Sequence, residues 1–111
     1  MLTEQPILIT SIKTFVQLTK HRIVSFNGNH SSSAPLGVCK ADTKPNSYAP
    51  IITHGIAMVE AGDSIFKGEK VGPDSLGRAV PDPFYNVCIG KALDSAMGAG
   101  EIIRVVLNQT S

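Results

Sequence analysis

Residues 55–71 read GIAMVEAGDSIFKGEKV, and this stretch shows the pattern that decides the fold class. Residues 55–59 form a short, largely apolar run that is typical of a strand, and residues 69–71 are a second short strand candidate that ends in the β-branched Val71. Residues 61–63 and 67–68 are glycine-containing turn formers that separate them. The stretch therefore predicts short strands joined by tight turns.

The same pattern continues on both sides of this stretch. Further short apolar runs occupy residues 7–12, 22–26, 36–39, 49–53, 87–93 and 102–107. No window keeps a 3.6-residue apolar period over three turns, and only residues 12–18, or a single turn at 92–97, are candidates for helix. We predict a mostly β protein, a small β-sandwich or barrel-like domain of short strands.

Length and composition are those of a single domain that binds to other protein surfaces. The 111 residues leave no room for a second domain. Charged residues make up 17% of the chain, against about 25% in typical soluble domains, which suggests that some surface is covered in use. We expect residues 14–111 to form this single β-rich domain.

Residues 1–13 are extended in character, rich in β-branched residues and sparsely charged. We predict that they form an extended N-terminal arm, which could add a strand to the edge of another protein through Ile7, Leu8, Ile9 and Ile12. An ordinary first strand of the domain is the alternative, and the sequence leaves both open.

Charge and hydropathy argue against two classes of partner. The formal net charge is +1, and the densest basic stretch, residues 20–22, is too short for nucleic-acid binding. No apolar run is long enough to cross a membrane. The N-terminus lacks the features of a signal peptide, so we expect synthesis in a cytoplasm without export.

The residues that bind metals or form disulfides do not make a recognisable site. Cys39 and Cys88 each lie among apolar residues, so we interpret both as small buried hydrophobic side chains. Whether they approach each other is left open. His21, His30 and His54 do not fall into zinc-ligand spacing with the cysteines, so we expect no metal.

Catalytic motifs are also missing. The glycines of residues 62–68 and 90–92 do not end in the Gly-Lys-Ser/Thr of a phosphate-binding loop, and we interpret them as turn residues. The serines beside His30 lie in a polar loop, and the carboxylates are scattered singly, mostly at turns. We therefore expect no catalytic residue, no cofactor and no enzymatic activity.

Five motifs in a fixed order carry a resemblance. They are the strand and turn of residues 55–63, IFKGEKV at 65–71, DSLGRA at 74–79, IGKALDSA at 89–96 and GEIIRVVL at 100–107. This series, within residues 22–107, resembles the capsid cement, or head decoration, proteins of tailed bacteriophages. The resemblance implies a structural virion protein that binds the outer surface of the assembled head and stabilises it.

The resemblance also implies partners and a location. The major capsid protein would be the partner, and the chain would act as a homotrimer on the capsid surface after synthesis in the host cytoplasm. Low charge and a small core independently suggest burial between copies. We expect Ile56 and Met58 in one strand, and Ile103 and Val105 in the last, to line the oligomer interface.

Two other functions remain open at this point. A barrel-sandwich carrier domain, such as those that hold biotin or lipoate, has a similar strand pair at residues 61–71. Such a carrier needs a modifiable lysine at a hairpin tip, whereas Lys91 lies in an apolar strand. A catalytic subunit whose site forms only on oligomerisation is the remaining alternative.

Overall fold

The computed structural model describes residues 5–30, 35–81 and 88–107, and within these ranges it contains strands and turns but no helix. The strands are β1 (Gln5–Thr14), β2 (Ile23–Ser25), β3 (Pro35–Cys39), β4 (Ser47–Glu60), β5 (Lys70–Pro73), β6 (Ala79–Val80), β7 (Gly90–Ala92) and β8 (Ile102–Leu107). This confirms the predicted mostly β domain. The helix considered for residues 12–18 is wrong, because β1 extends to Thr14 and Leu18 bridges Thr43. The turn considered at 92–97 is extended instead, and Ala96 bridges Ile65.

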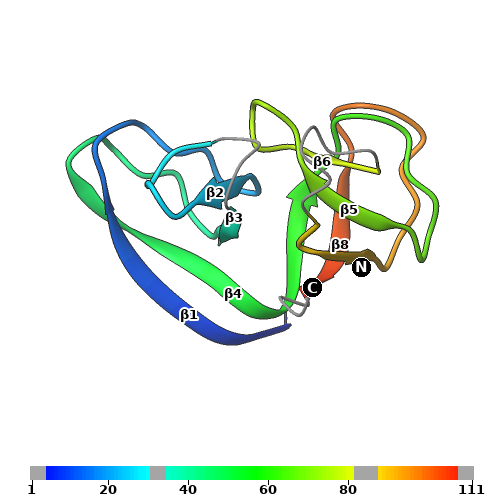
Figure 1. Ribbon diagram of the computed structural model, residues 1–111, viewed down its shortest axis with the longest axis horizontal. Helices are drawn as coiled ribbons and strands as arrows, with labels where there is room; N and C mark the ends of the chain where they lie inside the picture. The colour runs from blue at the N-terminus through cyan, green and yellow to red at the C-terminus, as the bar shows by residue number, and fades with distance from the viewer. Residues whose placement is uncertain (1–4, 31–34, 82–87, 108–111) are drawn as a thin grey trace.

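The strands form one curled, barrel-like sheet in the order β2-β3-β4-β8-β7-β5-β6, with β1 paired to β4 outside this path. The ladders between these strands are antiparallel. In Figure 1, β1 and the first part of β4 make a long curved ribbon beneath β2 and β3, and β5, β6 and β8 lie on the other side of the molecule. The chain therefore has a first half around β1–β3 and a second half around β5–β8.

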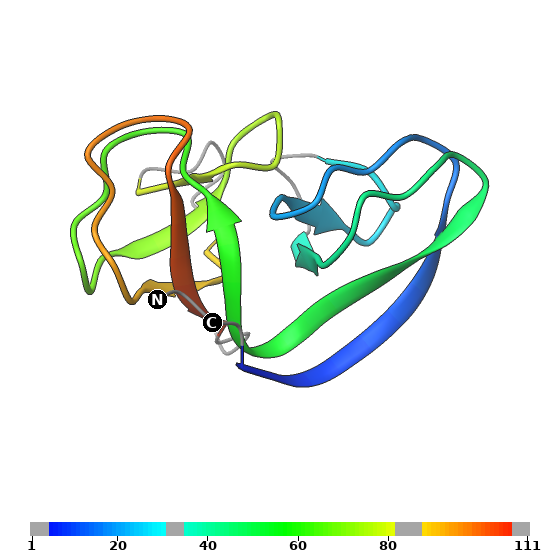
Figure 2. The same cartoon turned by 180° about the vertical axis from the view of Figure 1, so that it is seen from behind.

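Strand β4 joins the two halves. Its first part pairs with β1 and β3, and its last part, from Gly55 to Glu60, pairs with β8. Gly55 lies at this change of partner with a φ of 103°, a conformation that side chains with a Cβ rarely adopt. The sequence suggested two strands, at 49–53 and 55–59, but the glycine bends one strand rather than ending it (Figures 1 and 2).

The buried residues form two clusters. The larger one spans the second half and reaches Ile23 and Val38 of the first half. The smaller one lies between the ribbon and β2 and β3, and contains Leu18, Val24, Cys39, Ala49 and Ile51, with Ile12 packed against it. Both faces of the β3–β4 ladder are thus covered, which explains why its residues are continuously apolar rather than alternating.

The cysteines occupy different environments. Cys39 is buried in the smaller cluster, whereas Cys88 is exposed and both are free thiols. The interpretation of Cys88 as a buried hydrophobic side chain is therefore wrong. Burial raises the pKa of the Cys39 thiol, which keeps it protonated and unreactive at neutral pH.

Candidate interaction surfaces

The segment predicted as an arm is the first strand of the sheet. Strand β1 pairs along β4 from Gln5 opposite Ile56 to Thr14 opposite Ser47, with register shifts at Pro6/Leu8 and Leu8/Ile9. A boundary after residue 13 therefore cuts through a paired strand. The structure corresponds to the alternative that the sequence left open, a first strand of the domain.

The predicted arm residues lie in different settings along this strand. Ile12 is half-buried against the smaller core cluster, and Ile9 is 43% exposed. Ile7 and Leu8 lie in β1, and their side chains fall outside the described part of the structure. Ile12 therefore contributes to the fold, and Ile9 is available to a partner.

Among the described residues, no strand pairs with the outer edge of β1 around Ser11. The Pro50 carbonyl accepts a hydrogen bond from the Lys40 N–H on the β3 side, so the backbone of Pro50 faces away from β1. Its partner Ser11 therefore belongs to a non-hydrogen-bonded pair, and its own N–H and C=O point away from β4. By the same alternation, the backbone of Lys13 also points outward, but Gly28 covers it, because a Cβ on Gly28 would lie 3.1 Å from the Lys13 carbonyl oxygen. An unpaired edge of this kind can accept a strand from another protein.

Exposed apolar side chains gather at the ribbon beside this edge. Tyr48, opposite Lys13 in the ladder, is 69% exposed. The Lys13 ammonium lies 5.8 Å from the centroid of the Phe15 ring, which is also 69% exposed. We call Ile9, Phe15 and Tyr48 the ribbon patch. Together with the open edge, it offers a partner both backbone hydrogen bonds and apolar area.

The four residues predicted for an oligomer interface divide between the two faces of the sheet. Ile103 and Val105 are in the larger core cluster, at 2% and 0% exposure. Ile56 and Met58 are half-buried on the opposite, outward face. Side chains alternate along a strand, so Val106, at 38% exposure, is the outward apolar residue of β8. Ile103 and Val105 are core residues and give no side-chain area to a partner while the sheet is folded.

One ion pair stands on the outward face of β8. The Arg104 guanidinium donates to both carboxylate oxygens of Asp94, each at 2.9 Å, and the Arg104 N–H donates to the same carboxylate. These bonds lower the pKa of Asp94 to about 2. Asp94 therefore stays ionised across the ordinary pH range and fixes the loop before β8.

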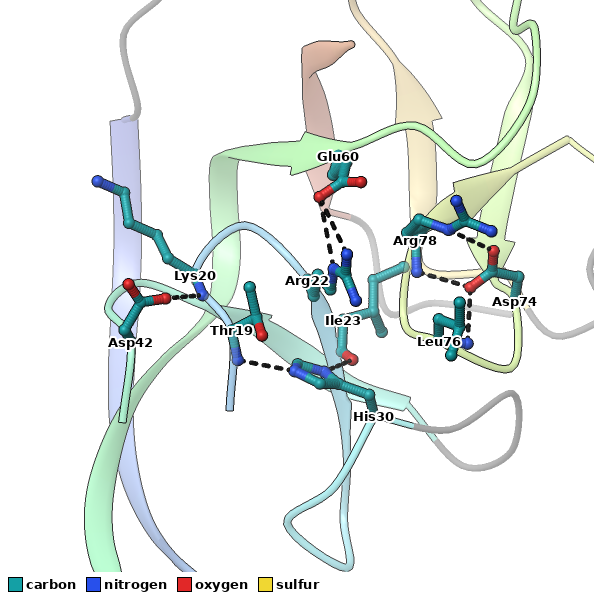
Figure 3. Close-up of polar contacts among 10 residues, drawn as sticks. All are labelled: Thr19, Lys20, Arg22, Ile23, His30, Asp42, Glu60, Asp74, Leu76 and Arg78. Carbon is teal, nitrogen blue, oxygen red and sulfur yellow. Dashed lines mark hydrogen bonds and ion pairs between the residues drawn. The ribbon is translucent and has the colours of Figure 1, made fainter. Parts of the chain in front are cut away.

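Polar contacts join the two halves of the molecule (Figure 3). The Ile23 N–H donates to the Gly77 carbonyl at 2.6 Å, and the Glu60 N–H donates to the His21 carbonyl at 2.8 Å. Arg22 and Glu60 form an ion pair at 3.4 Å. Asp74 accepts from the N–H groups of Leu76 and Arg78 and pairs with the Arg78 guanidinium, which fixes the turn that carries Gly77.

His30 lies at the same junction. Its Nε2 accepts from the Thr19 N–H at 2.9 Å, so the ring proton is on Nδ1, which donates to the Ile23 carbonyl at 2.9 Å. Burial lowers the pKa of His30, opposed by the bond to Ile23, and the charge of Arg22 lowers it further. The geometry requires the neutral ring, because a proton on Nε2 would remove the acceptor of Thr19. His30 thus acts as a structural clamp.

The described residues contain no group of three His, Cys, Asp or Glu side chains that could hold a metal ion. Within the same ranges, no helix is long and apolar enough to cross a membrane. Lys91 lies in β7 between β5 and β8, not at a hairpin tip, so it does not present itself as a carrier lysine.

A single curled sheet with an open edge strand, exposed apolar side chains and an internal clamp defines a small β-structured binding module. The chain belongs to the phage cement protein family, whose model matches residues 3–107. The crystal structure of the head fiber gp8.5 N base in bacteriophage phi29 is similar, with a TM-score of 0.73 at 16% identity. That match covers 94% of this chain and 98% of the other chain, so the two share a fold. The comparison with curated proteins gives no match.

Family membership confirms the class of protein inferred from the motif series. The chain is a structural protein of the phage head and a component of the virion, located on the capsid. Sequence reasoning missed the open edge at Ser11 and the clamp at His30. Both depend on strand register and on contacts between distant segments, for which the sequence has no local signal.

Proposed function

We propose that this chain is a cement module that binds the outer surface of the assembled head, contacts the major capsid protein and stabilises the shell without catalysing a reaction. The observation that carries the proposal is the open outer edge of β1, on a chain whose family is that of phage cement proteins. A capsid that holds packaged DNA gains stability when its subunits are bridged. Such bridging requires rigid contact surfaces and does not require catalytic groups.

The attachment that we propose uses the edge of β1 and the ribbon patch. A capsid strand added beside β1 would exchange backbone hydrogen bonds with Ser11, and Ile9 and Tyr48 would supply apolar contact. The predicted arm keeps its role in this form, as an edge strand instead of a free segment. Ile7 and Leu8 belong to the same strand and are included in the proposal.

We also propose that the module acts as a homotrimer. Three linked copies engage three capsid contacts together, so weak individual contacts give strong overall attachment. The low charged fraction of 17% is in keeping with surface that becomes covered. Ile56 and Met58 are the remaining candidates for the contact between copies, because they face outward on β4.

A single proline tests the edge of β1. Deleting residues 1–13 would remove a core strand, so we choose Ser11→Pro, whose missing N–H points away from β4 and costs no ladder bond. We expect the variant to keep its circular dichroism spectrum but to lose co-sedimentation with undecorated heads of the phage from which the chain comes.

Ser75→Pro is the matched control. Ser75 is exposed in the turn that the Gly77 N–H to Asp74 C=O bond closes, a position that favours proline. It should bind heads as the wild type does. Equal binding by folded Ser11→Pro would rule out the edge as the attachment. Failure of the wild type to bind these heads would reject the function.

A further inference from the structure

A row of outward side chains crosses four strands in register. Lys70 of β5 lies opposite Lys91 of β7, Lys91 opposite Val106 of β8, and Val106 opposite Ile56 of β4. We call these four residues the cross-strand row. It begins with two cationic side chains and continues with two apolar ones.

The placement of the two lysines opposite each other is unfavourable for the stability of the isolated chain. The Ala92 N–H donates to the Glu69 carbonyl at 2.9 Å, which makes Lys70 and Lys91 a non-hydrogen-bonded pair. Facing side chains come closest in such pairs, and like charges directly opposite destabilise a sheet. Both side chains are exposed, and neither has a polar partner among the described residues. Folding alone does not explain the pair.

The carboxylates that could neutralise the pair are engaged elsewhere in the chain. Glu60, Asp74 and Asp94 are held by the three arginines. The other acidic side chains of the described ranges accept from backbone N–H groups in turns and loops: Asp42, Asp63, Glu69 and Glu101. In a second copy of the chain, each described carboxylate would likewise already hold at least one hydrogen bond or ion pair.

We propose that Lys70 and Lys91 receive carboxylate side chains of an acidic protein surface on the phage head, with Val106 in apolar contact beside them. The proposal rests on the proposed function and deepens it. The pair lies on β7 and β5, beyond β8 as seen from β4, whereas the open edge of β1 lies on the other side of β4. One module would then touch the shell at two separate places, which bridging requires.

The composition of the row favours protein over nucleic acid as the partner. Nucleic-acid sites need several cations along a phosphate backbone, and binding grows with the number of phosphates neutralised. Here two ammonium groups are followed by the apolar Val106, and the net charge of the chain is only +1. A mixed cationic and apolar surface fits a protein interface with a few ion pairs.

The test uses charge reversal that leaves the local repulsion unchanged. Lys70→Glu with Lys91→Glu keeps two like charges opposite each other, so the melting temperature should stay near that of the wild type. Lys70→Glu alone creates an opposite-charge pair with Lys91 and should raise the melting temperature by a few degrees, roughly 2–4 °C. Lys20→Glu with Lys44→Glu is the control, because it makes the same net charge change at exposed lysines outside the row.

Binding to undecorated heads is measured by co-sedimentation at low and at high salt. We expect the double variant at Lys70 and Lys91 to bind about tenfold more weakly or worse, a loss of about 1.4 kcal/mol or more. The Lys70→Glu variant should also lose affinity for heads although it is more stable than the wild type. The control variant with Lys20→Glu and Lys44→Glu should bind as the wild type does. Raising salt from about 0.05 to about 0.5 M should weaken wild-type binding more than double-variant binding.

Each other outcome overturns the inference. Equal binding by wild type and double variant rejects the lysine pair but leaves the proposed function intact, whereas a wild type that does not bind heads rejects the function itself. Loss of binding to duplex DNA, with head binding kept, would make the pair a nucleic-acid site. A change of oligomeric state in light scattering, with head binding per chain kept, would make it a contact between copies.

Discussion

His30 contacts two segments that are distant from each other in sequence, residues 19–23 and the turn at Gly77. Its ring bonds to Thr19 and Ile23, and a Cβ at Gly77 would come within 2.9 Å of its Nδ1. Because Gly77 also accepts from the Ile23 N–H, the ring sits where the two halves of the molecule are joined. A change of charge on this one side chain therefore acts on the junction as a whole.

We predict that this clamp makes stability depend on pH. The folded pKa of His30 lies below the ordinary value of about 6.5, so the unfolded chain binds the proton more readily. The stabilisation is present above about pH 6.5 and is lost as the pH falls toward the folded pKa. The melting temperature of the wild type should drop between about pH 7.5 and about pH 5.5 more than that of His30→Gln.

His54→Gln makes the same substitution at an exposed histidine on β4, outside the junction, and should keep the wild-type pH dependence. If the melting temperatures of His30→Gln and of the wild type fall by the same amount over this range, the His30 ring is not the group responsible. Asp94 cannot account for the effect, because its pKa of about 2 lies well below the range tested.

At the scale of the strand, β7 shows how closely the sheet is packed. A Cβ on Gly90 would collide with the backbone carbonyl of Val106 in β8 and lie 2.8 Å from its carbon atom. These are backbone atoms, which cannot move away as the end of a flexible side chain could. The interpretation of Gly90 as a turn glycine is wrong, because Gly90 begins strand β7 and allows its close approach to β8.

We predict that Gly90→Ala destabilises the domain by about 1–3 kcal/mol, the usual range for forcing extra atoms into a packed site. Gly98→Ala is the matched control, since nothing lies within 4 Å of a Cβ at Gly98. Chemical denaturation of both variants measures the difference. Equal free energies of unfolding for the two would contradict the close packing of β7 on β8.

The strands themselves could be predicted from the sequence more readily than their partners. The β-branched run at 102–107 and the glycine-punctuated run at 55–71 predicted strands and turns correctly. Ile103 and Val105 were predicted to line an oligomer interface, and both are buried in the core, because alternation alone does not tell which of two apolar faces the domain itself covers. Likewise, β4 pairs with β8 and not with β5, although β5 is the next strand along the chain.

At the scale of the whole molecule, function depends on where the sheet leaves surfaces uncovered. The open edge of β1, the ribbon patch and the cross-strand row belong to different parts of one curled sheet. None of them could be derived from composition, since each needs the register between strands. The motif order, by contrast, was sufficient to indicate a phage cement protein, and the family match over residues 3–107 confirms it.

The central claim, that this chain stabilises the head by binding its surface, is tested most directly on the particle. Undecorated heads are mixed with the wild-type protein or with Ser11→Pro, then heated or osmotically shocked, and released DNA is measured. We predict that the wild-type protein raises the temperature at which DNA escapes and that Ser11→Pro does not. DNA release at the same temperature with and without bound wild-type protein would contradict the claim.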